Sequence, residues 1–261
     1  MTEQALTYTS YLALDEVLGA QRPRSDEHDE LLFIVVHQVY ELWFKQLLHE
    51  LRHVQDLLAQ AGTAASLHTL RRVLTILKVA VAQIDVLETM TPRQFTSFRH
   101  RLEAASGFQS AQFRELEAVL GRRDASALAA YPEDSSARQR IADTMARPSL
   151  YDSFLQYLAA HGYAVPVGAL QRDVTQPLAR RPELDDVLLA VYSDDGGPAQ
   201  VAERLVDLDE GFQEWRYRHV KMVERTIGDK TGTGGSMGAA YLRSTLSAPV
   251  FPDLWAIRSR L

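Results

Sequence analysis

The chain has 261 residues, of which 46% are hydrophobic and 24% are charged. This composition is typical of a folded, water-soluble domain and excludes a disordered or fibrous chain. Because the sequence contains no cysteine, it also excludes disulfides, Cys-ligated zinc, iron–sulfur clusters, thiolate-ligated or covalently attached haem, and a Cys nucleophile.

The charge distribution limits the partners and the location of the protein. The formal net charge is −6, and no Lys/Arg stripe is present to follow phosphates, so we expect no nucleic acid partner. Three acidic residues among residues 1–18 do not fit a secretory signal. The longest strongly apolar run, residues 31–36, is far shorter than the roughly 20 residues that span a bilayer. We therefore expect a soluble, cytoplasmic protein with no membrane partner.

Apolar periodicity predicts two long helices in the first third of the chain. From residue 31 to residue 58, apolar residues recur every three or four positions after an acidic start at residues 26–30, and this helix should end near Gly62. A second stripe, residues 67–87, predicts another long helix that ends before Pro92.

Shorter helices and one further long helix follow. We predict short helices over residues 92–102, 111–120 and 150–160, and a long one over about 199–227. The stretches 121–148 and 194–198 are expected to be irregular. Since no series of alternating strands appears, the sequence predicts one all-α domain over residues 1–261, a helical bundle.

Two histidines lie on the long helices in apolar surroundings. His37 has aromatic neighbours one helical turn away on each side, and His219 takes the place of an apolar residue on the last long stripe. A buried imidazole costs free energy unless a partner accepts from or coordinates its nitrogens. Each histidine is therefore either a core residue bonded to a nearby acceptor or a ligand-facing residue. Without cysteine, a haem in this chain would most naturally take His.

The segment from His49 to His53 has the pattern H-E-x-x-H, which on a helix places two imidazoles beside Glu50, as in zinc peptidases. Such a site needs a third ligand and an open position for water. Glu88 or His68 could supply that ligand, although no spacing indicates either. A solvated helix face explains the same residues.

Two other segments are candidates for binding an anion. Arg99 lies among phenylalanines, where it would either clamp a carboxylate or only carry charge at a helix end. The glycine-rich stretch 232–238 lacks the ending of a phosphate loop, but its backbone N–H groups and Thr233 could meet a small anion. A plain flexible loop is the alternative.

Taken together, five segments resemble those of the haem-dependent tryptophan 2,3-dioxygenases. They occur in the family's order and with similar spacing over nearly the whole chain. The segments are LFIVVHQVYELWFK (32–45), LETMTP (87–92), FR with SGFQS (98–99 and 106–110), WRYRH (215–219) and GTGGS (232–236).

The resemblance implies a helical bundle that encloses a haem pocket, with one b-type haem per chain and O₂ as co-substrate. It implies that His219 is the proximal ligand of the haem iron and that His37 faces the indole N–H. Arg99 would pair with the substrate carboxylate, and Thr233 with its ammonium and carboxylate end. The remaining implied contacts are pocket-lining Phe33, Phe95 and Ser106, and Tyr8 and Tyr11, which would reach a neighbouring subunit of a homotetramer built as a dimer of dimers. The segment 1–20 would make that contact.

The implied reaction is insertion of O₂ across the indole C2–C3 bond of L-tryptophan to give N-formyl-L-kynurenine, the first step of tryptophan degradation by the kynurenine route. Monooxygenation of tryptophan or a substituted tryptophan to an oxindole is the alternative within the superfamily. A zinc hydrolase and a helical interaction module without catalysis are the remaining hypotheses. Met237 and Ile84 depart from the family pattern, and both could reshape the pocket.

Overall fold

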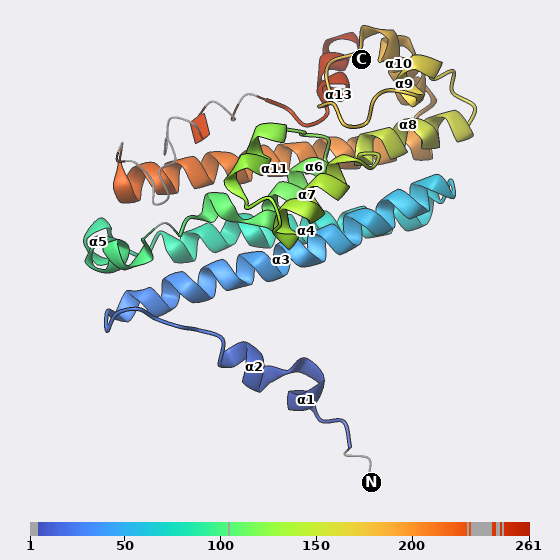
Figure 1. The fold of residues 1–261 in the computed structure, drawn as a ribbon. Coiled ribbons are helices and arrows are strands. Elements are labelled where there is room, and N and C mark those ends of the chain that lie inside the picture. Colours follow the sequence, from blue (N-terminus) through green and yellow to red (C-terminus); the bar gives the residue numbers. More distant parts are fainter. Residues whose placement is uncertain (1–4, 104, 229, 231–241, 244–245, 247) are drawn as a thin grey trace.

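Three long helices run along the centre of the protein. In the computed structural model, which describes residues 5–103, 105–228, 230, 242–243, 246 and 248–261, these are α3 (His28–Ala59), α4 (Thr63–Leu87) and α11 (Gly197–Ile227). The short turn after Ala59 reverses the chain, so α4 runs back along α3, and α11 lies against the other side of α4 (Figure 1). The predicted all-α fold is confirmed, and the described residues contain no strand.

Shorter helices cover the sides and the two ends of this stack. Helices α6 and α7 lie across its middle, α5 closes one end, and α8, α9, α10 and α13 gather at the other end (Figure 1). Short 3₁₀ segments join several of them. The bounds are α5 Pro92–Arg99, α6 Ala111–Val119, α7 Ser136–Met145, α8 Leu150–Ala160, α9 Val167–Leu170, α10 Asp185–Asp194 and α13 Pro252–Ala256, with 3₁₀ segments at His100–Leu102, Gly107–Gln109, Ala125–Ala130, Pro182–Leu184 and Arg258–Arg260.

Most predicted helices are present at the expected positions, but one stretch differs and several short helices were not predicted. The stretch 121–148, predicted to be irregular, contains α7 and a 3₁₀ segment. Only Ile141 and Thr144 of α7 are buried, too few to form an apolar stripe, although Ser135 caps the helix. Helix α10 was not predicted, and it leaves only residues 195–196 between itself and α11.

The main core fills the space between the long helices and α8. It is rich in leucine and aromatic rings, and α13 closes it through Phe251 and Leu254. A second, smaller cluster lies at the α5 end, where Val36 of α3 meets Leu87, Met90 and Phe98. The end of the bundle beside α5 is therefore packed separately from the rest, and space for a site remains between the two clusters.

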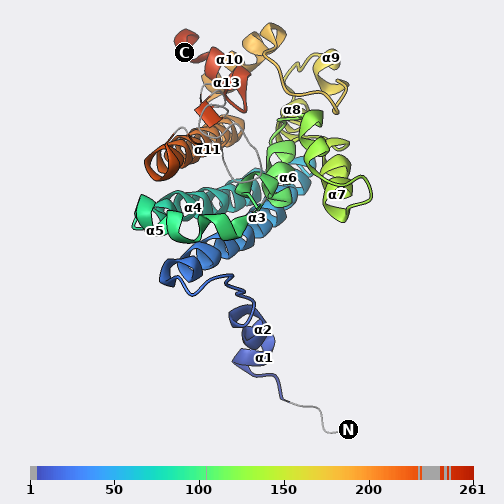
Figure 2. The same cartoon turned by 60° about the vertical axis from the view of Figure 1, so that its left-hand side comes forward.

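The N-terminal arm, residues 5–27 with α1 (Tyr8–Leu12) and α2 (Leu14–Leu18), extends away from the bundle (Figures 1 and 2). Its apolar side chains face solvent: Tyr8 is 75% exposed and Tyr11 72% exposed. The base of the arm is fixed, because the buried carboxylate of Glu30 accepts hydrogen bonds from the backbone N–H groups of Arg24 and Ser25, each at 2.8 Å.

Helix α3 is the one described helix that is long and apolar enough to cross a bilayer when judged by length and composition. In the fold it packs against α4, α6 and α8, and it contributes several of the largest core residues. Core helices of water-soluble bundles meet the same criterion, so this is weak evidence for a membrane segment.

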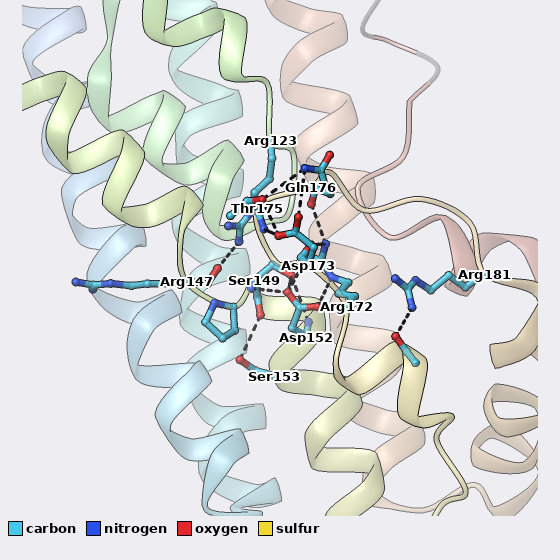
Figure 3. A network of polar contacts seen from close by, with 12 residues as sticks. Arg123, Arg147, Ser149, Asp152, Ser153, Arg172, Asp173, Thr175, Gln176 and Arg181 are labelled. Atoms are coloured by element: carbon cyan, nitrogen blue, oxygen red, sulfur yellow. Dashed lines mark hydrogen bonds and ion pairs between the residues drawn. The ribbon is translucent and has the colours of Figure 1, made fainter. Parts of the chain in front are cut away.

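A buried network of charged groups joins α8 to the loop that follows it (Figure 3). Arg172 donates two hydrogen bonds to the carboxylate of Asp152, at 2.5 and 2.7 Å. The same carboxylate accepts from the backbone N–H and the hydroxyl of Ser149, the N-cap of α8. Arg123 donates to the backbone carbonyl of Arg147 at 2.6 Å, after the end of α7. These hydrogen bonds hold α8 against the segment that follows α9 and hold Arg123 against the segment that follows α7.

We predict that Asp152→Asn lowers the free energy of unfolding by about 3 kcal/mol at neutral pH, because it leaves the buried Arg172 without its counter-charge. Burial alone would raise the pKa of Asp152, but hydrogen bonds from Arg172 and Ser149 outweigh burial and hold this pKa below its ordinary value of 3.8. The carboxylate therefore stabilises the fold fully above about pH 4, and this contribution is lost as the pH falls through the lowered pKa.

Urea titrations of the wild type and the variant at a series of pH values measure the effect. The difference between the two proteins should shrink from about pH 4 downwards. A difference that stays constant with pH would contradict this account of the pair.

Candidate active site

An apolar cavity lies at the α5 end of the bundle, enclosed by α3, α4, α5, α6 and α11 and by the 3₁₀ segment Gly107–Gln109. Aromatic and aliphatic side chains supply most of its wall, as expected of a pocket for a small organic molecule. These lining residues include Phe33, Tyr40, Phe44, Ile84, Leu87, Phe95, Phe113, Trp215 and Met222.

His37 enters this cavity from α3. Its Nδ1 donates a hydrogen bond to the carbonyl oxygen of Phe33, one turn earlier, at 2.7 Å, and the two rings lie 4.1 Å apart between centroids. Because a carbonyl can only accept, Nδ1 carries the proton and Nε2 is left as an acceptor. Burial lowers the pKa of His37, so the ring is neutral near pH 7.

His219 enters the same cavity from α11. Its ring stacks on Trp215, with centroids 5.0 Å apart, and no described residue forms a hydrogen bond with its imidazole. Burial, and secondarily the nearby His37, lower its pKa to about 4. This histidine is therefore neutral, and it is only partly buried because its ring lines the cavity. A neutral imidazole in such a position is suited to coordinate a metal ion.

Two short elements bring polar groups to the mouth of the cavity. Arg99 is the last residue of α5, a helix anchored to α3 by Phe33, whose ring lies 5.7 Å from those of both Phe95 and Phe98. Ser106 caps the following 3₁₀ segment and accepts from the backbone N–H of Phe108 at 3.4 Å. These aromatic contacts fix the end of α5, and with it the position from which the Arg99 guanidinium group reaches the cavity.

Most residues singled out by the sequence meet at this cavity. Phe33, His37, Phe95, Arg99, Ser106 and His219 all line it, and so does Ile84. Thr233 and Met237 lie outside the described residues. Tyr8 and Tyr11 lie on the exposed arm and do not line the cavity of their own chain.

Several polar lining residues were not predicted from the sequence. Glu41, Arg114, Glu117 and Arg216 all contribute to the wall. A signal for Arg216 was present, because it lies three residues before His219 on the buried side of the predicted stripe, where a charge is unexpected.

The H-E-x-x-H segment has a different role in the structure. Glu50 is buried and accepts hydrogen bonds from Arg72 at 3.1 Å and from Gln46 at 2.7 Å, whereas His49 and His53 are exposed. Within the described residues, no group of three or more His, Asp or Glu side chains is arranged to hold a metal ion. The structure therefore does not support the zinc hydrolase hypothesis.

Comparison with known proteins shows the family. The model of the tryptophan 2,3-dioxygenase family matches residues 1–158 and 178–261. The chain belongs to this family. It is 67% identical over 259 residues to a tryptophan 2,3-dioxygenase of Anaeromyxobacter dehalogenans, which covers 98% of this chain and 97% of the relative. It is 59% identical to the tryptophan 2,3-dioxygenase of Herpetosiphon aurantiacus and 46% identical to that of Caulobacter vibrioides, each over 99% of both chains.

Family membership confirms the resemblance seen in the five sequence segments. It also identifies the chain as an oxidoreductase, so the hypothesis of a helical interaction module without catalysis is not supported. His37 and His219 line one cavity, which makes this cavity the candidate active site.

Proposed function

We propose that this protein inserts both atoms of O₂ across the indole C2–C3 bond of L-tryptophan and releases N-formyl-L-kynurenine, the first step of the kynurenine route. The observation that carries the proposal is the pair of neutral imidazoles, His37 and His219, facing one apolar cavity. Relatives at 59% to 67% identity are all named tryptophan 2,3-dioxygenase, which favours ring cleavage over the oxindole alternative.

The cofactor in this proposal is a b-type haem, one per chain. The neutral imidazole of His219 lines the cavity and has no hydrogen-bond partner among the described residues, so it fits the role of axial ligand. The aromatic wall fits a large flat ring. When bound, the haem supplies the redox chemistry that activates O₂. Stacking on Trp215 would hold the His219 ring in a single orientation.

His37 would orient the indole ring. Since Nδ1 is committed to the carbonyl of Phe33, Nε2 points its lone pair away from α3 and can accept a hydrogen bond from the indole N–H. This role requires a neutral ring but no removal of a proton. His37 is thus the catalytic residue in the proposal, and it acts by position and hydrogen bonding.

Arg99 would bind the substrate carboxylate, and Thr233 would contact the ammonium and carboxylate end. Phe33, Phe95 and Ser106 would line the space for the indole ring. A substrate held at both its charged end and its indole N–H has little rotational freedom, and such positioning lowers the barrier of the chemical step.

The exposed arm supports a homotetramer built as a dimer of dimers, in which residues 1–20 contact a neighbouring subunit. Tyr8 and Tyr11 expose rings that are normally buried. The outer face of the bundle is also apolar, with Leu31, Leu42 and Val79 all more than 40% exposed. In this proposal each subunit is a single cytoplasmic catalytic domain over residues 1–261.

The decisive experiment is single-turnover chemistry. Purified protein, supplemented with haem and reduced without oxygen, is mixed with L-tryptophan and then with O₂, and the mass of the product is recorded. We expect a gain of two oxygen atoms. A gain of one oxygen atom would indicate the oxindole route instead.

The His219→Ala variant is the control for the haem assignment. We expect the wild type to show a Soret band and this variant to lose stable haem binding. A wild type that shows no Soret band after haem supplementation would refute the proposed function.

Replacement of Arg99 by Ala should raise KM for L-tryptophan by about tenfold to a hundredfold, because a charged hydrogen-bond pair to the carboxylate is lost. The Soret band should keep its position, since Arg99 is not expected to ligate the haem. Steady-state kinetics at saturating O₂ measure the effect, and an unchanged KM would contradict the carboxylate clamp.

Substitution of both Tyr8 and Tyr11 by Ala should lower kcat/KM at least about tenfold through lost contact in a neighbouring pocket. Tyr217→Ala, an exposed tyrosine on α11, is the matched control and should have no such effect.

Mixed oligomers test whether the arm acts between chains. Chains with the two substituted tyrosines retain an intact cavity, and His219→Ala chains retain an intact arm. Co-assembly of the two impaired forms should raise the activity above that of either form alone. Absence of any recovery in verified mixed tetramers would show that the arm acts within its own chain.

A further inference from the structure

Two glutamines from different helices donate hydrogen bonds to the backbone of α3 on either side of His37. Nε2 of Gln83, on α4, donates to the carbonyl oxygen of Val36 at 2.8 Å. Nε2 of Gln112, on α6, donates to the carbonyl oxygen of Glu41, also at 2.8 Å. We call Gln83 and Gln112 the glutamine pair. Both side chains are partly buried, and neither lines the cavity.

Each hydrogen bond of the glutamine pair has a second bond beside it. Tyr40 of α3, one turn after Val36, donates its hydroxyl to the carbonyl oxygen of Ala80 on α4 at 2.8 Å, so the two helices exchange donors. On the other side, the amide of Gln112 also donates to the carboxylate of Glu41 at 2.8 Å. Because a backbone carbonyl oxygen has two lone pairs, it can accept such a bond and keep its bond within the helix.

The two carbonyls of α3 face different neighbours. Val36 and Glu41 are five residues apart, which is about 140° around the helix axis and about 7.5 Å along it. One bond would hold α3 against a single neighbour, whereas bonds from α4 and from α6 oppose its rotation in both directions. Side-chain packing constrains this turn less, since His37 faces a cavity and not a packed neighbour.

The position of the His37 ring follows that of α3. Its Nδ1 is bonded to the carbonyl of Phe33 in the same helix, and no described residue of another element forms a hydrogen bond with the imidazole. The ring therefore moves with the helix backbone. A group at the surface of a helix about 10 Å across is displaced by about 1 Å when the helix rolls by roughly 10°. Such a shift is enough to break a hydrogen bond made by Nε2.

We propose that the glutamine pair fixes the rotation of α3 so that Nε2 of His37 meets the indole N–H of tryptophan. This inference rests on the proposed function, in which His37 accepts that hydrogen bond. Gln83 and Gln112 are then positioning residues, which act through the backbone of α3 and not by touching the substrate. They give the site its preference for an indole over a ring of the same shape that has no N–H donor.

Paired binding measurements on the full-length, haem-loaded protein test the proposal. The two ligands are L-tryptophan and its benzothiophene analogue, in which sulfur replaces the indole N–H. Their dissociation constants are measured without O₂, so that no turnover occurs. In the wild type the analogue should bind at least about fivefold more weakly than tryptophan, the net value of one hydrogen bond between uncharged groups.

The ratio of the two dissociation constants should fall in Gln83→Met and in Gln112→Met, whose side chains have similar length but no donor. His37→Ala, which has no acceptor for the indole N–H, gives the lower limit of the ratio. Both glutamine variants should move most of the way from the wild-type value to this limit. A merely structural role would weaken both ligands alike and leave the ratio unchanged.

A double-mutant cycle adds a readout that only positioning of His37 would move. In a His37→Ala background, Gln83→Met should leave the ratio unchanged, because the acceptor that the glutamine positions is already absent. Gln112→Met takes the place of Gln83→Met in this cycle if that variant does not fold. A further fall of the ratio in the His37→Ala background would contradict the proposal.

Gln55→Met is the matched control. Gln55 is on the same helix, about five turns beyond His37, and its amide also donates to a backbone carbonyl, that of Pro148, at 3.0 Å. It does not line the cavity. Since its bond holds α3 far from His37, this variant should keep the wild-type ratio.

The results that would overturn the proposal differ from those that would refute the proposed function. A wild-type ratio in both Gln83→Met and Gln112→Met would show that the glutamine pair is structural only, while ring cleavage itself would stand. A wild type whose ratio equals that of His37→Ala would show that His37 does not bond the indole N–H, and the inference would fail with that role. A wild type that retains no haem would refute the proposed function as well.

Discussion

The presence of a neutral imidazole, that of His219, at the wall of an apolar cavity is the feature on which the site depends. Along most of their length α3, α4 and α11 pack tightly through leucine and aromatic side chains, but at the α5 end they leave a cavity between two hydrophobic clusters. The apolar surroundings of His219 lower its pKa and keep its ring neutral. A ligand that binds this imidazole in the folded state would stabilise the fold.

Rigid and short elements carry different parts of the site. His37 and His219 belong to helices of about 30 residues, whose positions are fixed by the core. Arg99 and Ser106, in contrast, lie at the end of α5 and at the cap of a 3₁₀ segment, where only a few aromatic contacts hold the backbone. In the proposed function, the side of the cavity that would hold the haem is therefore the better fixed one.

The sequence predicted the long helices well. An apolar stripe of some thirty residues clearly distinguishes the 3.6-residue repeat of a helix from the two-residue repeat of a strand. It failed where few residues are buried: α7 buries only Ile141 and Thr144, and α10 only Leu188 and Val191. The two histidines were visible as polar residues in apolar surroundings on long helices. The group of arginines around Glu117 was not visible, because Arg114, Arg122 and Arg216 come from different segments and only the fold brings them to this carboxylate.

Helix α3 links the cavity to the surface of the subunit. Its inner face carries His37, its outer face exposes Leu31 and Leu42, and near its first turn Glu30 fixes the base of the N-terminal arm. The arm leaves the bundle in a direction away from the long helices (Figures 1 and 2). Because its base is fixed, the arm holds Tyr8 and Tyr11 in solvent, away from the cavity of their own chain. In a tetramer, a site would then be complete only when a neighbouring subunit supplies its arm, so assembly and catalysis would depend on the same helix.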